Sequence, residues 1–326
     1  MNKTRLIGYT LAIAILALLV SPVMAKNLYT PAQKPFSLIV SKDVTIPYPG
    51  RDRGLSMRVS WPSEGRHLPV LIWSHGLLGS QDAYRPLIDA LVPYGYVVIQ
   101  PTHADSLTYQ KVSLKSFKNK NERPKEISHI IDHLPDIARQ GPGLSTVAQL
   151  DNIAAGGHSY GAYTTQLLAG MTLKRPFNFS NEKRTDFHDP RLRAFVAMSP
   201  QGTGRTIDNK SYQTMTDPIL FVTGSKDENP VNKKDVHWRL EAVTFTPSKD
   251  SYLLYLEGAG HNLGGISGKK FPGSEEDNAN FLAAVQSTTL AFLDAHLKGS
   301  APAKQYLESD ILSKISNYQA QIIRKH

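Results

Sequence analysis

The chain has no cysteine among its 326 residues. This absence excludes disulfide bonds, a thiol nucleophile, covalent haem attachment and a zinc site built on cysteine. It also excludes a lipid anchor on a cysteine after the N-terminal apolar segment. An exported protein can fold without disulfides when its core is large, and a chain of this length is ample for such a core.

Long apolar runs are scarce as well. The unbroken apolar block at residues 11–20 is shorter than the roughly 20 residues that span a bilayer. Two basic residues precede this block, and Val23-Met24-Ala25 follows it as a small-x-small cleavage site. We therefore expect residues 1–25 to be a signal peptide, with a retained membrane anchor as the alternative. Residues 26–326 would then be a single exported domain, periplasmic or extracellular, without a stable membrane anchor.

Acidic residues are the minority among the charges, with 28 Asp and Glu against 37 Lys and Arg and a net charge of +9. The positive charge is dispersed along the chain. Its densest run, at residues 111–125, lacks the regular interleaving of aromatic residues that would indicate a nucleic-acid surface. We interpret this run as a solvated loop that favours anionic surfaces, and we expect no nucleic-acid partner.

The remainder of the chain alternates short apolar runs with amphipathic segments. Runs such as VLIW, YVVI and ILFV are apolar throughout, which is typical of parallel strands buried on both faces. The pattern predicts an α/β fold with a doubly wound, mostly parallel sheet and antiparallel strands at its N-terminal edge. A turn is expected at Asp52-Arg53-Gly54, between the first two strands. The expected strands are 37–40, 56–61, 70–74, 96–100, 152–155, 193–198, 218–223 and 251–256, and the expected helices are 83–92, 124–138, 160–171 and 276–296.

Three polar residues follow three of the predicted buried strands. Ser159 follows strand 152–155, Asp227 follows strand 218–223, and His261 follows strand 251–256. In doubly wound sheets, chemistry gathers in the loops at the carboxyl ends of the strands. The chain order Ser, Asp, His is the order expected for an α/β-hydrolase triad. We therefore predict that these three residues are catalytic.

The segment around Ser159 reads GGHSYGAY, with glycines at 157 and 161. A tight turn is the simpler interpretation of such glycines. The more specific interpretation is a strained strand-to-helix elbow that exposes the serine hydroxyl. The three strand-end residues favour the elbow.

The chain resembles the α/β-hydrolase superfamily over roughly residues 50–300. The resemblance is carried by the stretches WSHGLLGSQDAY, GGHSYGAYTTQLLAG, AFVAMSPQG, ILFVTGSKD and EGAGHN. These stretches look like those of bacterial dienelactone-hydrolase-like esterases and platelet-activating-factor acetylhydrolase-like lipases. The chain departs from dienelactone hydrolases proper, which use a cysteine nucleophile. The resemblance implies an α/β-hydrolase fold and an esterase activity without a cofactor.

The chemistry of acyl transfer assigns a role to each residue. Ser159 would be the nucleophile, His261 its base and then the general acid, and Asp227 the group that orients His261. The backbone N–H groups of Leu77 and Tyr160 would form the oxyanion hole. Three glycines would serve the loop and the elbow: Gly76, Gly157 and Gly161.

Several residues have rival interpretations. Asp227 could instead be a helix cap, and the neighbouring Glu228 is an alternative carboxylate. His75 and His158 lie inside the motifs, and we interpret them as packing and backbone-orienting residues. His103 could line the cleft.

Two segments resemble ligand-binding motifs without matching them. His129 and His133 have the spacing of a metal-binding pair, but the HExxH glutamate and a third ligand are missing, so we expect exposed helix residues and no metal. Residues 264–270 resemble a phosphate-binding loop, but their glycine spacing is short and no Ser or Thr follows the lysine. We interpret them as a mobile loop.

The position where a cap domain would be inserted holds only the short polar stretch 201–217, and the other insertion, 105–123, is basic and polar. Little or no cap is therefore expected, and an open cleft would suit short-chain or bulky exposed esters of small or polymeric substrates. A peptidase or acyltransferase on the same triad remains open, as does a non-catalytic binding protein with this fold.

Overall fold

The computed structural model describes residues 27–109, 121–174, 184–269 and 277–325. The expected signal peptide lies outside the described residues. So do residues 111–120 of the basic run at 111–125, and Lys270 and Glu276 at the ends of two predicted segments.

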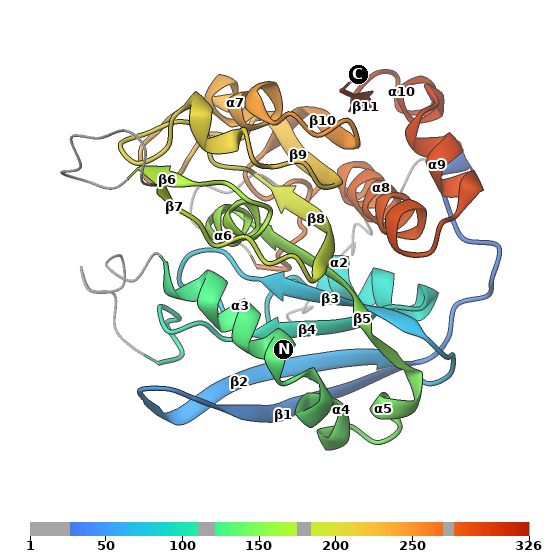
Figure 1. The fold of residues 1–326 in the computed structure, drawn as a ribbon. Helices are drawn as coiled ribbons and strands as arrows, with labels where there is room; N and C mark the ends of the chain where they lie inside the picture. The colour runs from blue at the N-terminus through green and yellow to red at the C-terminus, as the bar shows by residue number, and fades with distance from the viewer. Residues whose placement is uncertain (1–26, 110–120, 175–183, 270–276, 326) are drawn as a thin grey trace, which may run out of the picture.

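One large sheet organises these residues (Figure 1), and a two-stranded sheet of β6 and β7 lies apart from it. The large sheet has the strand order β1-β2-β4-β3-β5-β8-β9-β10-β11. Neighbours from β4 to β10 run parallel, while β1, β2 and β11 pair antiparallel. The strands are β1 (Leu38–Tyr48), β2 (Arg51–Pro62), β3 (Leu68–Ser74), β4 (Val97–Pro101), β5 (Ala148–His158), β6 (Leu173–Lys174), β7 (Arg184–Thr185), β8 (Leu192–Met198), β9 (Ile219–Lys226), β10 (Ser251–Gly260) and β11 (Ala320–Arg324).

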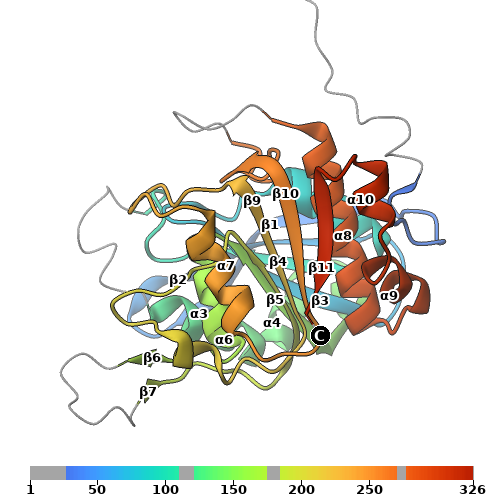
Figure 2. The ribbon, with the colours of Figure 1, turned by 90° about the horizontal axis from the view of Figure 1, so that it is seen from above.

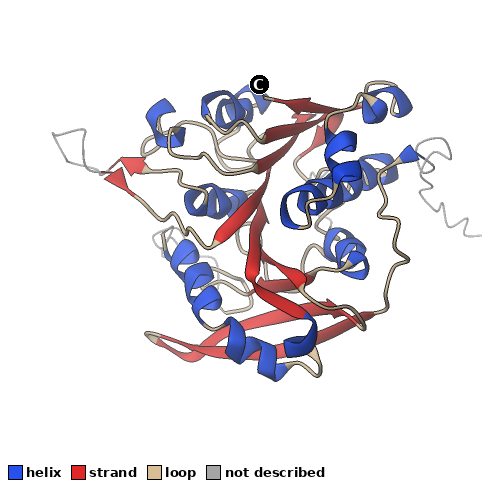
Figure 3. Ribbon diagram, turned by 45° about the vertical axis from the view of Figure 1, so that its right-hand side comes forward, coloured by secondary structure: helices blue, strands red, loops and turns tan. Residues whose placement is uncertain are grey.

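Helices cover both faces of the sheet, as Figures 2 and 3 show. Because the central strands are buried on both faces, two apolar clusters form, one on each side. Helices α3, α4, α6 and α7 contribute to one cluster, and α2, α8 and α9 to the other. The helices are α2 (Arg85–Leu91), η1 (Val92–Tyr94), α3 (Glu122–Asp132), α4 (Leu134–Gln140), α5 (Leu144–Val147), α6 (Tyr160–Leu168), η3 (Asn209–Tyr212), α7 (Val236–Phe245), α8 (Ala279–Leu297), α9 (Ala301–Leu307) and α10 (Ile311–Ile315).

This architecture is the predicted α/β-hydrolase fold, with a mostly parallel sheet and antiparallel N-terminal edge strands. Between β8 and β9 the chain forms loops and the single turn η3, and no cap domain is built from these residues. Within the described residues, no helix is both long and apolar enough to cross a bilayer.

The predicted turn at Asp52-Arg53-Gly54 is wrong. The hairpin turns at Pro49-Gly50 instead, and residues 52–54 belong to β2. Gly50 adopts φ +75°, which suits a tight turn. Gly54 also has a positive φ, but within the strand, where a Cβ would lie 2.4 Å from the carbonyl oxygen of Ile46. This glycine therefore serves close strand approach.

The predicted helix 124–138 is two helices, α3 and α4, which meet at His133. Pro135 lies in the first turn of α4, and its missing N–H and its ring prevent an uninterrupted helix. Helices α7, α9 and α10 and the edge strand β11 were not predicted, because their segments mix polar and apolar residues without a strong period.

Candidate active site

Ser159 occupies a strained turn between β5 and α6. Its backbone has φ 58° and ψ −112°, a conformation that non-glycine residues rarely adopt. Two glycines allow this turn to press against β3. A Cβ on Gly161 would lie 2.0 Å from the carbonyl oxygen of Ser74, and one on Gly157 would lie 2.5 Å from the Gly161 backbone. Both positions therefore require glycine for space.

The structure brings the three predicted catalytic side chains together. His261 Nε2 lies 3.0 Å from Ser159 Oγ, and His261 Nδ1 lies 2.7 Å from Asp227 Oδ1. The imidazole is 27% exposed, whereas the Asp227 carboxylate is fully buried. Glu228, the alternative carboxylate, is exposed. Because Asp227 accepts the Nδ1 proton, Nε2 is free to accept the proton of the serine hydroxyl.

Asp227 is held by partners on three sides. Thr223 Oγ1 donates to Oδ2 at 2.8 Å, and the buried guanidinium of Arg239 lies with Nε 3.0 Å from Oδ1. Burial works to raise the pKa of Asp227, but the positive charge of Arg239 and the hydrogen bond from His261 outweigh it and lower this pKa to about 2. The carboxylate is therefore ionised at any working pH.

His158 connects the loop of His261 to the loop after β3. Its Nε2 donates to the His261 carbonyl oxygen at 2.7 Å, and its Nδ1 accepts from the hydroxyl of Tyr84 at 3.0 Å. The same hydroxyl accepts the N–H of Gly76 at 3.0 Å. Burial, and then the nearby His261, lower the pKa of His158 to about 3. A neutral, buried His158 thus orients backbone, as expected from the sequence.

The loop after β3 lies beside the serine elbow. A Cβ on Gly76 would be 2.9 Å from the Tyr84 hydroxyl and 3.7 Å from the carbonyl oxygen of His158. The amides of Leu77 and Tyr160 donate no hydrogen bond to another group among the described residues. Both therefore have the donor capacity that an oxyanion hole requires.

A comparison with protein families supports the same superfamily. A family model described as Chlorophyllase matches residues 41–182, which is less than half of the chain. The matched segment contains Ser159 and the loop after β3, and it ends before Asp227 and His261. Together with the sheet topology, this match is consistent with the α/β-hydrolase superfamily. The chain has the α/β-hydrolase fold. No curated protein matches it.

The protein contains a second Ser-His-acid chain, which the sequence did not predict. Ser74 Oγ lies 2.8 Å from His103 Nε2, and His103 Nδ1 lies 2.5 Å from Glu126 Oε2. All three side chains are buried, so no substrate can reach Ser74. The suggestion that His103 lines the cleft is therefore wrong. Burial opposes ionisation of Glu126, but His103 and Arg51 lower its pKa to about 2.

The burial of two arginines was not predicted from the sequence. Arg239 lies in α7, a segment without a sequence signal. Arg123 belongs to the run at 111–125 that was interpreted as solvated, yet it is 2% exposed and pairs with Asp105. The flanking Lys125 is exposed, and Pro124 beside a helix start was the only local feature that set Arg123 apart. A sequence shows that a residue is charged, but it does not show whether the folded chain buries that residue.

The glycine-rich segment after His261 does not match the predicted mobile loop over the residues that the structure describes. Gly264, Gly265, Ile266 and Ser267 are buried, and Ser267 Oγ donates to Asn262 Oδ1 at 2.6 Å. A Cβ on Gly264 would lie 2.7 Å from the amide nitrogen of Leu282 in α8. Gly264 therefore serves tight packing against this helix.

His129 and His133 are half-buried rather than exposed, with ring centres 4.1 Å apart. Each makes a hydrogen bond to a backbone carbonyl oxygen. Across the described residues, no group of three or more His, Asp or Glu side chains is arranged to hold a metal.

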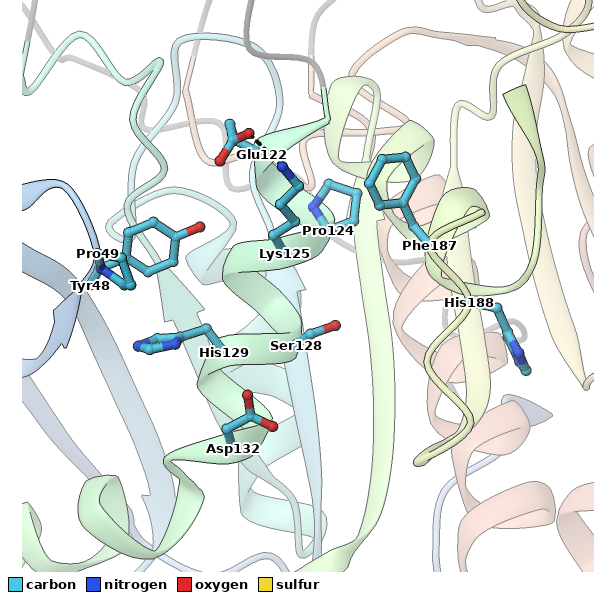
Figure 4. A pocket seen from close by; sticks show the side chains of 10 residues that line it. All are labelled: Tyr48, Pro49, Glu122, Pro124, Lys125, Ser128, His129, Asp132, Phe187 and His188. Carbon is cyan, nitrogen blue, oxygen red and sulfur yellow. Dashed lines mark hydrogen bonds and ion pairs between the residues drawn. The ribbon is translucent and has the colours of Figure 1, made fainter. Parts of the chain in front are cut away.

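A surface cavity of about 490 Å³ lies along α3, shown in Figure 4. None of the triad residues lines it. Its charged groups are solvated, and Lys125 pairs with Glu122 inside it. The residues that line the cavity are Tyr48, Pro49, Glu122, Pro124, Lys125, Ser128, His129, Asp132, Phe187 and His188.

Proposed function

We propose that the protein is a serine esterase that cleaves carboxylic esters through an acyl-enzyme. The observation that carries this proposal is the continuous hydrogen-bonded chain from Ser159 Oγ to His261 Nε2 and from His261 Nδ1 to Asp227. A serine hydroxyl is a weak nucleophile until a base accepts its proton, and this arrangement supplies the base and its orienting carboxylate.

The reaction follows from the roles of these groups. Ser159 Oγ attacks the ester carbonyl while His261 Nε2 takes the proton of the serine hydroxyl. The oxyanion that forms accepts hydrogen bonds from the N–H groups of Leu77 and Tyr160. The imidazolium then protonates the departing alcohol, which leaves the acyl-enzyme. Water attacks this ester while His261 takes one of its protons; the bond between the acyl carbon and Ser159 Oγ then breaks, His261 returns the proton to Ser159 Oγ, and the acid is released. Asp227 remains ionised throughout and stabilises the imidazolium, consistent with its lowered pKa of about 2.

Esters, rather than amides, are the proposed substrates, because an ester needs less assistance to its leaving group. The short connection between β8 and β9 supports an open cleft for short-chain or bulky exposed esters. The name of the matched family adds chlorophyll as a bulky candidate. The basic start, apolar block and cleavage site in residues 1–25 support action outside the cytoplasm.

The nucleophile can be tested with a fluorophosphonate probe and mass spectrometry of the labelled peptide. We expect a single label on Ser159 and no label on the Ser159→Ala variant. Ser74→Ala is the matched control, since Ser74 also contacts a histidine but is buried. It should keep the label on Ser159. Labelling of another residue, or ester turnover by Ser159→Ala, would overturn the proposal.

The substrate class needs a separate panel. p-Nitrophenyl acetate, butyrate and palmitate, chlorophyll, a peptide amide and an alcohol acceptor should be compared at equal enzyme concentration. We expect turnover to fall steeply from butyrate to palmitate, with no peptide cleavage and little acyl transfer. A preference for palmitate would contradict the open cleft, and faster peptide cleavage would make the enzyme a peptidase.

A further inference from the structure

An ion pair joins Asp105, which follows β4, to Arg123 in the first turn of α3. Arg123 Nε donates to Asp105 Oδ1 at 2.9 Å, and Arg123 Nη2 donates to Asp105 Oδ2 at 2.6 Å. Burial works to raise the pKa of Asp105, but Arg123 holds it below its usual range. Such a two-pronged contact fixes the plane of the guanidinium as well as its position.

The same guanidinium also contacts the proposed oxyanion loop. Arg123 Nη1 donates to the carbonyl oxygen of His75 at 2.5 Å, and Nη2 donates to that of Gly76 at 3.2 Å. Its Cζ lies 4.2 Å from the ring centre of Tyr160. One buried cation therefore touches the loop of one oxyanion donor and the residue that carries the other.

The contact with Gly76 has a geometric consequence for Leu77. The carbonyl of Gly76 and the N–H of Leu77 belong to one peptide group, which is planar and trans, so they point in opposite directions. A donor that holds the carbonyl oxygen therefore directs the N–H away from itself. The positive charge also polarises the peptide and makes its N–H a stronger donor.

His75 reinforces this orientation. The backbone N–H of His103 donates a hydrogen bond to Nε2 of His75, with 3.1 Å between the two nitrogens. The ring proton of His75 is therefore on Nδ1. Nδ1 lies 2.7 Å from the carbonyl oxygen of Gly76 and donates to it. Burial lowers the pKa of His75 well below its ordinary value, and Arg123 lowers it further, so the ring stays neutral.

We propose that Arg123 is a positioning residue for the oxyanion hole, which aims and polarises the Leu77 amide and packs on Tyr160. This inference rests on the proposed esterase function. It assigns a role in the transition state to a cation that does not touch the substrate. Loss of one oxyanion donor typically lowers turnover by about 10²–10³-fold, so loss of its orientation should be of similar size.

The test compares Arg123→Gln and Arg123→Lys in the full-length enzyme, with p-nitrophenyl butyrate and a trifluoromethyl ketone that forms a tetrahedral adduct on serine. We expect Arg123→Gln to lower kcat about 100-fold with little change in KM. The affinity of the enzyme for the ketone should fall by a similar factor. Arg123→Lys should recover part of both, because it restores the charge but not the two-pronged contact.

Arg58→Met is the matched control. Arg58 is also a buried arginine with a carboxylate partner, Asp89, but it does not contact the oxyanion loop. This variant should lose stability while its kcat per folded molecule stays within about twofold. If Arg123→Gln behaves in the same way, or if its kcat falls without matching loss of ketone affinity, the proposal is overturned.

A second variant covers the case in which Arg123→Gln fails to fold. Asp105→Asn keeps the shape of the partner and weakens its hold on the guanidinium, so it should show a smaller, parallel loss of kcat and ketone affinity. An Asp105→Asn enzyme with wild-type values for both would overturn the proposal. Failure of the esterase function itself is distinguishable, because the wild-type enzyme would then show no Ser159-dependent turnover.

Discussion

The guanidinium of Arg239 lies beside both partners of the hydrogen bond between Asp227 and His261. Its Nε is 3.0 Å from Asp227 Oδ1, and its Nη2 is 3.2 Å from His261 Nδ1. Further N–H groups donate to the carbonyl oxygens of Ser199 and Pro200 at 2.9 and 3.0 Å. The Arg239 guanidinium therefore lies behind the Asp227 carboxylate, which contacts the proposed base His261. It also balances the buried negative charge of Asp227.

Arg239→Met should be costly, because it leaves the Asp227 carboxylate buried without its cation. We expect a loss of about 3–5 kcal/mol in the free energy of unfolding, measured by urea denaturation. Arg58→Met should cost less, because its carboxylate partner Asp89 is 26% exposed. A loss in Arg239→Met no larger than that in Arg58→Met would contradict the role of the cation.

Asp227→Asn should lower kcat strongly, because an amide cannot hold His261 in the required tautomer. Comparable substitutions in a serine protease triad cost about 10⁴-fold. Glu228→Gln is the matched control, because this exposed neighbour lies next in sequence and makes no contact with the imidazole among the hydrogen bonds of the described residues. Steady-state kinetics of both variants decide which carboxylate serves His261. Equal losses would refute the assignment of Asp227.

Gly161→Ala should disrupt the elbow, because its new Cβ would lie 2.0 Å from the carbonyl oxygen of Ser74. Backbone must move to relieve this clash, and we expect a loss of about 3 kcal/mol or more together with loss of fluorophosphonate labelling. Gly204→Ala is the control, since nothing lies within 4 Å of its Cβ position. Thermal unfolding measures both, and a stable, fully labelled Gly161→Ala enzyme would contradict the packing described.

Ester turnover should fall at acid pH, because His261 must be neutral to accept the serine proton. We expect kcat/KM to be lower at about pH 5 than at about pH 8. A pH series of kcat/KM with p-nitrophenyl butyrate measures it. A flat profile across this range would remove His261 as the base.

Stability should also decline in acid, for a different reason. His75, His103 and His158 are buried and have lowered pKa values, about 3 for His158. Below about pH 6.5 the unfolded chain binds protons that the folded state does not, so each group removes up to about 1.4 kcal/mol per pH unit. Asp227 and Glu126, with pKa values near 2, add to this loss only below about pH 4.

The measurement is the free energy of unfolding as a function of pH. His158→Asn should reduce the slope between pH 6.5 and 4 by about one proton, whereas substitution of the exposed His237 by Gln should leave it unchanged. The same slope in both variants would show that His158 is not a buried neutral group.

Local pattern along the chain predicts several parts of this protein. Continuous apolar runs predicted the buried parallel strands, and the polar residues after them predicted Ser159, Asp227 and His261. The carboxyl ends of parallel strands lie at one edge of a sheet, so residues distant in the chain could be expected to meet there. Pattern alone therefore indicated both the fold and the candidate triad.

Which charged side chains are buried depends on how the chain is folded. Arg123 sits in a run of basic residues and Arg239 in a mixed helix, and both carry the same charge as solvated neighbours such as Lys125. Their burial depends on carboxylates and carbonyl groups supplied by other segments, Asp105 and the oxyanion loop for one, Asp227 for the other. Charge is a property of one residue, whereas the balance between desolvation and pairing is a property of the assembled site.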